Sequence, residues 1–275
     1  MRKMKYLFLM TALFSFVFVA GCKNASNKEA KEGSAAEEQK ESVAEEKAEA
    51  APLNTLTPEE QQNGWVLLFD GKTSNGWRGY GKDHFPNGWE VVDGTLHCKG
   101  SGRGEAGSEE GGDIIYDKKF KDFDLKLEWK ISKGGNSGIF YLAQETDKPI
   151  WATAPEMQVL DNERHPDAKL GKDGNRQAGS LYDLIPAKPQ TAKPAGEWNQ
   201  VEIIVYRGTV IHKMNGETVV EYHLWTPEWD SLVAHSKFPK YNPDWAKVAE
   251  EGYIGLQDHG DDVWYRNIKI KDLTK

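Results

Sequence analysis

The sequence has few cysteines and no excess of basic residues. Its 275 residues contain two cysteines, and 35 Lys and Arg stand against 43 Asp and Glu, for a formal net charge of -8. A chain of this charge lacks the basic patch that neutralises nucleic-acid phosphates, so we expect no nucleic-acid partner. It also lacks a Gly-rich phosphate cradle, a G-x-S-x-G turn and an H-E-x-x-H pair, which are signatures of nucleotide-binding proteins, α/β-hydrolases and zinc proteases.

Residues 1–21 read as a signal peptide for export. Three basic residues precede a short apolar run that ends in VAGC. That ending resembles a bacterial lipobox, in which Cys22 is lipidated after cleavage; an ordinary secretion signal with an incidental cysteine is the alternative. We therefore expect an exported protein, anchored by lipid in the periplasm or at the cell surface. With Cys22 lipidated, Cys98 has no partner for an intrachain disulfide, and we expect it to be a small buried residue.

Two further segments follow the signal. Residues 22–55 are rich in Glu, Lys, Ala and Ser, with almost nothing apolar to bury, which predicts a solvated tether. Residues 56–275 are long enough to form one domain with a substantial core.

Strand patterns dominate the domain. Apolar and charged residues alternate in FDLKLEWKIS, and Asp-Gly at 93–94 and Asn-Gly at 215–216 are typical of two-residue hairpin turns. Ten Trp, ten Tyr and ten Phe suit packing on pleated sheets. Without a β-α-β rhythm or helical heptads, this pattern predicts an all-β fold, a jelly-roll sandwich of antiparallel sheets. Residues 225–250 depart from it and read as an ordered insertion, with a short helix in NPDWAKVAEE.

Three stretches place polar side chains where a sandwich core would need apolar ones. Glu156 and Gln158 share one face of EMQVLD, and Tyr182 lies in AGSLYDLI. GLQDHG carries Gln257, Asp258 and His259 at the end of a strand. Each has a structural alternative, because an edge strand can face water, a tyrosine can fill a core and a histidine can form a hydrogen bond at a bend. In combination they predict one cleft on a sheet face.

A metal site is a further alternative. The carboxylates of Glu156 and Asp161 and the imidazoles of His165 and His259 are oxygen and nitrogen ligands that divalent metals accept. No spacing among them enforces such a site, so the sequence requires no cofactor and leaves a divalent metal open.

Seven motifs occur in an order that resembles one bacterial family. Across residues 65–272 they are LFDGKTSNGW, GGNSGIF, EMQVLDN, AGSLYDLIP, GEWNQVEI, MNGETVVEY and GYIGLQDHGDDVWYRNIKI. Together they resemble the 3-keto-disaccharide hydrolase family, formerly a domain of unknown function, over the whole folded domain. The resemblance implies a concanavalin A-like jelly roll with its ligand on the concave sheet. It also implies export or lipid anchoring, as in many members from Bacteroidota.

The resemblance further implies the chemistry. Family members cleave glycosides whose sugar carries a ketone at C3, which acidifies the hydrogen on C2. A base removes this proton, an enolate forms, the group on C1 leaves and water adds to the enone. Such a route needs a base, a polariser for the ketone oxygen and an acid for the leaving group. It also requires a partner sugar oxidoreductase that supplies the oxidised glycoside.

Residue roles follow as expectations from this resemblance. His259 is the expected base, and Glu156 is the alternative base or the residue that orients the histidine. Asp161 and His165 would complete the acid function or bind a metal. The substrate-binding candidates are Asn136, Gln158, Tyr182, Gln257 and Arg266, and the candidates for a stacking wall are Trp225, Trp229 and Trp245.

Two other functions compete with this one. The first is a non-catalytic carbohydrate-binding lipoprotein that uses the same face, since jelly rolls serve both roles. The second is a retaining glycosidase, which would need Glu156 and another carboxylate about 5 Å apart across a cleft. A cleft lined mainly by aromatic rings would favour the binding protein, whereas polar groups beside small residues favour the enzyme.

Overall fold

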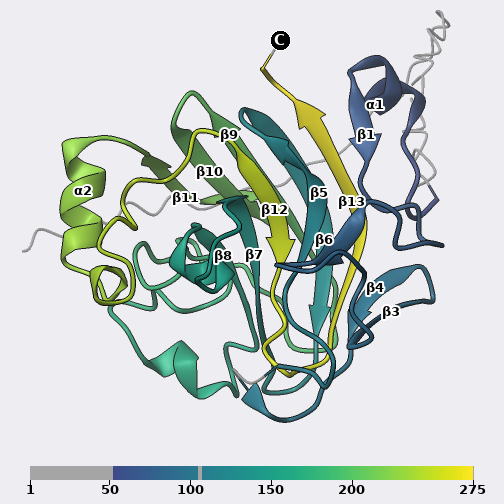
Figure 1. Cartoon of the computed structure of the whole chain (residues 1–275), viewed down its shortest axis with the longest axis horizontal. Helices are drawn as coiled ribbons and strands as arrows, with labels where there is room; N and C mark the ends of the chain where they lie inside the picture. The colour runs from purple at the N-terminus through teal and green to yellow at the C-terminus, as the bar shows by residue number, and fades with distance from the viewer. Residues whose placement is uncertain (1–51, 105–106, 275) are drawn as a thin grey trace, which may run out of the picture. The chain divides into compact units, whose positions relative to one another are not determined.

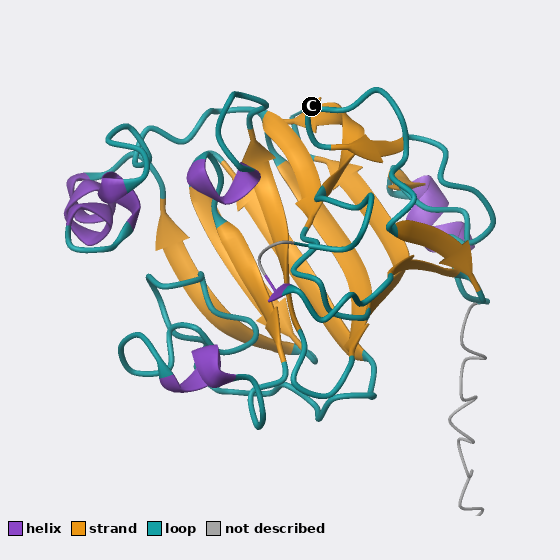
Figure 2. Ribbon diagram, turned by 60° about the horizontal axis from the view of Figure 1, so that its bottom comes forward, coloured by secondary structure: helices purple, strands orange, loops and turns teal. Residues whose placement is uncertain are grey.

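The computed structural model describes residues 52–104 and 107–274, which form two packed β-sheets (Figures 1 and 2). The predicted signal peptide, Cys22 and most of the predicted tether lie outside the described residues. All strand pairings between the described elements are antiparallel, which confirms the expected sandwich. Among these residues, no helix is both long and apolar enough to cross a membrane.

The larger sheet runs in the order β11-β10-β9-β6-β13-β4-β3, and β1 pairs with the end of β13. Its strands in the described chain are β1 (Trp65–Leu67), β3 (Trp89–Val92), β4 (Thr95–Cys98), β6 (Phe123–Ile131), β9 (Asn199–Tyr206), β10 (Thr209–Met214), β11 (Glu217–His223) and β13 (Val263–Asp272).

The smaller sheet runs in the order β2-β5-β12-β7-β8. Its strands are β2 (Trp77–Gly79), β5 (Ile114–Phe120), β7 (Asn136–Ala143), β8 (Glu156–Leu160) and β12 (Gly252–Leu256). The short helices among the described residues are α1 (Pro58–Gln62), α2 (Pro227–Ala234), and the 3-10 turns η2 (Ile150–Ala152), η3 (Pro166–Lys169) and η4 (Phe238–Lys240).

The predicted hairpins are confirmed. Asp93 and Gly94 have φ of 49° and 71°, and Asn215 and Gly216 have φ of 52° and 91°. Positive φ at both central residues is the geometry of the type I′ turn, whose twist matches that of paired strands. Local turn chemistry therefore fixes the pairing of β3 with β4 and of β10 with β11.

The insertion contains a helix, but not where the sequence analysis placed it. Helix α2 begins after Thr226, whose hydroxyl accepts a hydrogen bond from the backbone N–H of Trp229, and Pro227 occupies the first helical position. Residues 242–251 form turns and irregular structure instead. At their start, the Asn242 side chain accepts a hydrogen bond from the N–H of Asp244 and donates one to the carbonyl of Ala152.

The main core lies between the sheets. Alternate residues of β6, beginning with Phe123, are buried as predicted, and they pack with the inward side chains of the smaller sheet, including Ile139, Met157 and Ile254. Cys98 is fully buried, as expected, and burial raises the pKa of its thiol.

A second, smaller apolar cluster lies on the opposite face of the five-stranded sheet. It contains Ile115, Phe140 and Ile150, and Trp151 packs against it. Because loops and the insertion cover this outer face, the polar residues of β8 on that side are buried although β8 is an edge strand. The functional residues therefore lie in a covered site outside the main core.

Candidate active site

A pocket of about 330 Å³ opens on the covered outer face of the five-stranded sheet. This volume is within the range of small-molecule sites. The lining residues come from β7, β8, the loops after β12 and before β5, the 3-10 turn η2 with the residue before it, the segment after η3, and the insertion. They are Gly107, Gly112, Asp113, Asn136, Pro149, Trp151, Glu156, Gln158, Tyr182, Lys237, Phe238, Tyr241, Gln257, Asp258 and His259.

Six residues with an expected catalytic or binding role line this pocket, although they are distant in the sequence. Strands β7 and β8 pair, so Asn136 comes close to Gln158. The segment after β8 returns along its edge, where the N–H of Tyr182 donates to the carbonyl of Glu156 at 3.0 Å. The six are Asn136, Glu156, Gln158, Tyr182, Gln257 and His259. Their functional roles stay predictions.

Glu156 is a buried carboxyl group that faces the pocket. The exposed fraction of Glu156 is 6%. In the orientation of the Gln158 amide that satisfies both its oxygen and its nitrogen, that nitrogen donates a hydrogen bond to Oε1 of Glu156 at 3.2 Å. Burial raises the pKa of Glu156 to about 8, although the positive charge of Lys237 partly opposes the shift. A carboxyl group with this pKa exchanges its proton near neutral pH.

Asp113 is a second pocket carboxyl group, and the sequence analysis missed it. Its Oδ1 accepts a hydrogen bond from the N–H of Asp258 at 2.9 Å. Burial raises the pKa of Asp113 to about 7, and the negative charge of Asp258 adds to the effect. No motif marks Asp113, and the only available signal was a carboxylate directly before the apolar pair at 114–115.

Asp258 has a structural part in building the pocket wall. Its carboxylate accepts hydrogen bonds from the backbone N–H groups of Ser108 at 2.9 Å, Gly112 at 2.7 Å and Gly260 at 3.0 Å. Burial alone would raise its pKa, but these hydrogen bonds outweigh burial and lower it. Asp258 is therefore an ionised anchor that fixes the loop ending at Gly112.

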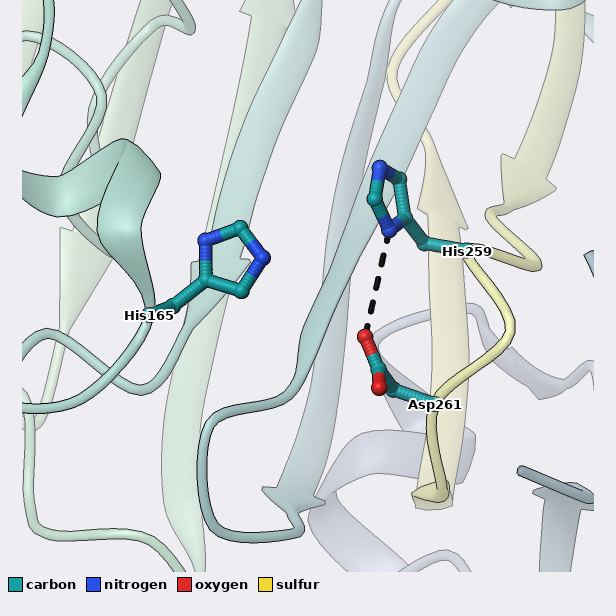
Figure 3. Close-up of side chains that lie close together, drawn as sticks. All are labelled: His165, His259 and Asp261. Carbon is teal, nitrogen blue, oxygen red and sulfur yellow. Dashed lines mark ion pairs between the residues drawn. The ribbon is translucent and has the colours of Figure 1, made fainter. Parts of the chain in front are cut away.

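His259 lies beside His165 and Asp261 (Figure 3). Its Nδ1 is 3.8 Å from Oδ2 of Asp261, and the two histidine rings are 6.1 Å apart between centroids, at 82°. Asp261 was not singled out from the sequence. Burial lowers the pKa of His165, and the neighbouring His259 lowers it further.

A charged network forms another side of the pocket. The hydroxyl of Tyr182 donates to Asp167 at 2.9 Å and accepts from Nζ of Lys237 at 3.0 Å. Asp167 also pairs with Arg176 at 2.7 Å. Burial lowers the pKa of Lys237 and raises that of Tyr182. Lys237 belongs to the insertion, and the sequence analysis did not select it because nothing in its neighbours indicates a site.

The aromatic side chains of the pocket differ from those expected. Trp229 and Trp245 are buried and stack on each other with centroids 5.7 Å apart, so they hold the insertion together. Trp225 is 44% exposed and is not among the pocket residues. The aromatic wall instead consists of Trp151, Phe238 and Tyr241.

The expectation for Arg266 is wrong. It lies on β13 of the larger sheet, where its Nε donates to Glu128 at 2.7 Å and its guanidinium stacks 3.8 Å from the ring centroid of Trp198. A bulge at Asn267, with φ of 52°, changes the side-chain alternation, so Arg266 and Ile268 point to different faces.

Asp161 supports the site from outside the pocket. Its buried carboxylate accepts from the N–H of Gly134 at 2.7 Å and of Glu163 at 3.1 Å, and these hydrogen bonds outweigh burial and lower its pKa. Its carbonyl accepts from the N–H of His165 at 3.0 Å. Asp161 therefore positions the loop that carries His165.

Two buried polar atoms in the pocket have no hydrogen-bond partner among the described residues. They are Oε1 of Gln257 and Nδ1 of His259. Since an unsatisfied buried polar atom costs about 1–3 kcal/mol, both atoms are suited to receive a ligand.

Comparison with known proteins identifies the family of the chain. The sequence model of the 3-keto-alpha-glucoside-1,2-lyase-like domain matches residues 64–271. A 3-keto-disaccharide hydrolase from Bacteroides thetaiotaomicron is 55% identical over 244 residues, which cover 82% of this chain and 83% of that protein.

Solved structures from Parabacteroides distasonis share the fold. A glycosyl hydrolase candidate solved at 1.70 Å has a TM-score of 0.70 and 30% identity, covering 81% of this chain and 100% of its own. A second, solved at 2.00 Å, has a TM-score of 0.58 and 26% identity, covering 77% of this chain and 100% of its own. With the match over residues 64–271 and these relatives, the chain belongs to the family of 3-keto-alpha-glucoside-1,2-lyase-like domains.

Proposed function

We propose that this protein cleaves the glycosidic bond of 3-keto-glycosides by removing the C2 proton, eliminating the group on C1 and adding water to the resulting enone. The name of the Bacteroides thetaiotaomicron relative supports a 3-keto-disaccharide as the substrate. The same proposal includes export, lipid anchoring at Cys22 and a separate sugar oxidoreductase that supplies the ketone.

The observation that carries the proposal is the buried carboxyl group of Glu156. Its pKa of about 8 lies near neutral pH, so the group can accept the C2 proton and later donate it to the departing oxygen. An ordinary carboxylate with its usual pKa would be a poor donor at this pH. We therefore assign proton transfer to Glu156, which the sequence analysis had as the alternative to His259.

Lys237 is the donor best placed to stabilise the enolate, and the hydroxyl of Tyr182 positions it. Nζ of Lys237 is 3.0 Å from the hydroxyl of Tyr182, and both residues line the pocket with Glu156. Preorganised donors of this kind stabilise charge that develops on an oxygen in a site shielded from water. Gln158 and Gln257 would orient the sugar hydroxyls.

The test compares a chromogenic 3-keto-glucoside with its unoxidised parent. We expect release from the keto form alone, and Glu156→Gln should lower kcat by about 10²–10⁴-fold because proton transfer is lost while the volume is kept. Glu163→Gln, at a carboxylate 69% exposed in an adjacent loop, should leave kcat unchanged.

Sugar binding without release from either compound would contradict catalysis and leave a carbohydrate-binding protein. Release from the parent at an equal rate would contradict the requirement for a ketone. Full activity in Glu156→Gln would return the base assignment to His259.

A further inference from the structure

We propose that His165, His259 and Asp261 bind one divalent transition-metal ion at the pocket, and that this ion coordinates the oxidised sugar. The ligating atoms of these three residues lie within 4.8 Å of one another. In a bound site with ligand distances near 2.1 Å, such atoms would be about 3–4 Å apart, so a small closure of the loops brings them into position. Coordination of the oxidised sugar by this ion rests on the proposed function.

The side chains converge from two separate loops. His165 follows β8, whereas His259 and Asp261 follow β12. Figure 3 shows one ring nitrogen of His165 directed towards the other two side chains, while Nδ1 of His259 faces Asp261. Two imidazoles and one carboxylate together form a ligand set that binds Mn²⁺, Fe²⁺, Co²⁺ or Zn²⁺.

Two local observations favour metal ligation over an ordinary hydrogen-bonded cluster. Nδ1 of His259 is buried and has no hydrogen-bond partner among the described residues, since 3.8 Å to Asp261 is too long for a hydrogen bond. Oδ2 of Asp261 accepts a hydrogen bond from the N–H of Asn136 at 3.0 Å, which holds the carboxylate in place. Such outer contacts orient the ligands of metal sites.

Ligation would change the tautomer of His165. Its Nδ1 accepts a hydrogen bond from the N–H of Asp167 at 3.2 Å, so the other ring nitrogen carries the proton in the free protein. A metal at that nitrogen displaces this proton and moves it to Nδ1, and the contact with Asp167 then opens. The amide signal of Asp167 should therefore shift when metal binds.

Three protein ligands leave coordination positions open for substrate. A C3 ketone oxygen and its neighbouring C2 hydroxyl form a bidentate oxygen pair, and a divalent ion bound to them would withdraw charge from the ketone. Of the three ligands, His259 lines the pocket together with Glu156, so the ion would lie beside the pocket. In this arrangement His259 is a metal ligand rather than the base.

The experiment measures binding of Co²⁺ to the protein after treatment with EDTA and dialysis, by calorimetry and visible absorption. We expect one ion per chain, and His165→Ala, His259→Ala and Asp261→Asn should each weaken affinity by more than about 100-fold. His97→Ala is the matched control. His97 also contacts two carboxylates, but Glu90 and Asp262 occupy its two ring nitrogens at 3.0 and 2.8 Å, so its loss should not affect Co²⁺.

Absence of stoichiometric Co²⁺ binding, or equal binding by wild type and all three ligand variants, would overturn the metal site. Melting curves of each variant check that the fold is retained. Partial recovery of activity in His165→Ala at high Co²⁺ concentration would support ligation, because metal cannot replace a missing base.

Cleavage of the 3-keto-glucoside distinguishes this inference from the proposed function. Undiminished cleavage by metal-free protein would overturn the role of the ion in sugar binding and leave the proposed function standing. Metal binding that depends on the three residues, without any cleavage, would support the site and contradict the function.

Discussion

Gly138 on β7 is a residue whose lack of a side chain makes room for the pocket carboxyl group. A Cβ at this position would lie 2.0 Å from Oε1 of Glu156. The backbone φ of Gly138 is one that alanine also adopts, so the obstacle is this contact and not backbone strain. Glycine is therefore required at position 138 by the neighbouring carboxyl group of Glu156.

Gly138→Ala should lower kcat/KM by at least about tenfold, because the displaced carboxyl group loses its alignment with the substrate. Its effect on the free energy of unfolding should shrink when combined with Glu156→Ala, since the residue that clashes is then gone. A double-mutant cycle from urea unfolding measures this coupling. An equal cost in both backgrounds would show that Gly138 serves another purpose.

Asp258 supplies a second prediction at the residue scale. Asp258→Asn should lower the free energy of unfolding by about 1–3 kcal/mol, since an amide presents N–H groups to backbone donors that now bind a carboxylate. Asp262→Asn is the control, because its partly exposed carboxylate accepts from the N–H of Gly100 at 3.1 Å. Urea unfolding should show a loss below about 1 kcal/mol for the control. Equal losses would contradict the anchoring role.

At the scale of elements, the insertion completes a pocket that the sheet alone leaves open. Helix α2 and the turns after it bring Lys237, Phe238 and Tyr241 over the outer face of the smaller sheet. Trp229 and Trp245 form the interior of this insertion, and Nε1 of Trp245 donates to the carbonyl of Trp151 at 2.9 Å. The insertion thus has its own packing and presents a different set of rings to the ligand.

Tyr241→Ala should raise KM about three- to tenfold with little change in kcat, because an aromatic contact contributes about 0.5–1.5 kcal/mol. The Tyr241 ring is 54% exposed and meets Trp151 edge-on, with centroids 4.9 Å apart. Trp225→Ala removes a comparably exposed ring of the same insertion that does not line the pocket. Steady-state kinetics on the keto-glucoside should show an unchanged KM for Trp225→Ala. A fall in kcat alone for Tyr241→Ala would contradict a binding role.

At the scale of the whole molecule, the pocket carboxyl groups make stability depend on pH. Burial raises the pKa of Glu156 to about 8 and that of Asp113 to about 7, whereas both ionise near pH 4 in the unfolded chain. Between these values the unfolded state has released the protons that the folded state keeps. The free energy of unfolding contributed by these groups therefore falls as pH rises from about 4 to 8.

Glu156→Gln should remove part of this pH dependence. The variant should gain stability over wild type of about 5 kcal/mol at pH 9, with a much smaller difference at pH 4, because glutamine has no proton to lose. Thermal unfolding at the two pH values, in EDTA, measures the effect, and Glu163→Gln is the exposed control. A difference independent of pH would show that the fold does not hold Glu156 protonated.

Local patterns in the sequence predicted much of the fold. Alternation in FDLKLEWKIS predicted the buried face of β6, and two Gly-containing dipeptides predicted their hairpins, because side-chain direction and turn type depend on adjacent residues. AGSLYDLI, in contrast, forms isolated bridges at Leu181 rather than a strand. Its backbone follows β8 only briefly, and the chain then turns within the same segment.

The sequence by itself determined that the chain is an antiparallel sandwich and which strands end in polar groups. These properties follow from the alternation of apolar and polar residues along the strands and from short turns. Only the tertiary structure decided that Asp113, Lys237 and Asp261 join those groups and that Arg266 does not. The physical reason is distance along the chain: side chains from separate loops meet through packing, and one bulge reverses the direction of a strand residue. The raised pKa of Glu156 also depends on tertiary structure, because it results from burial of the carboxyl group in the folded chain.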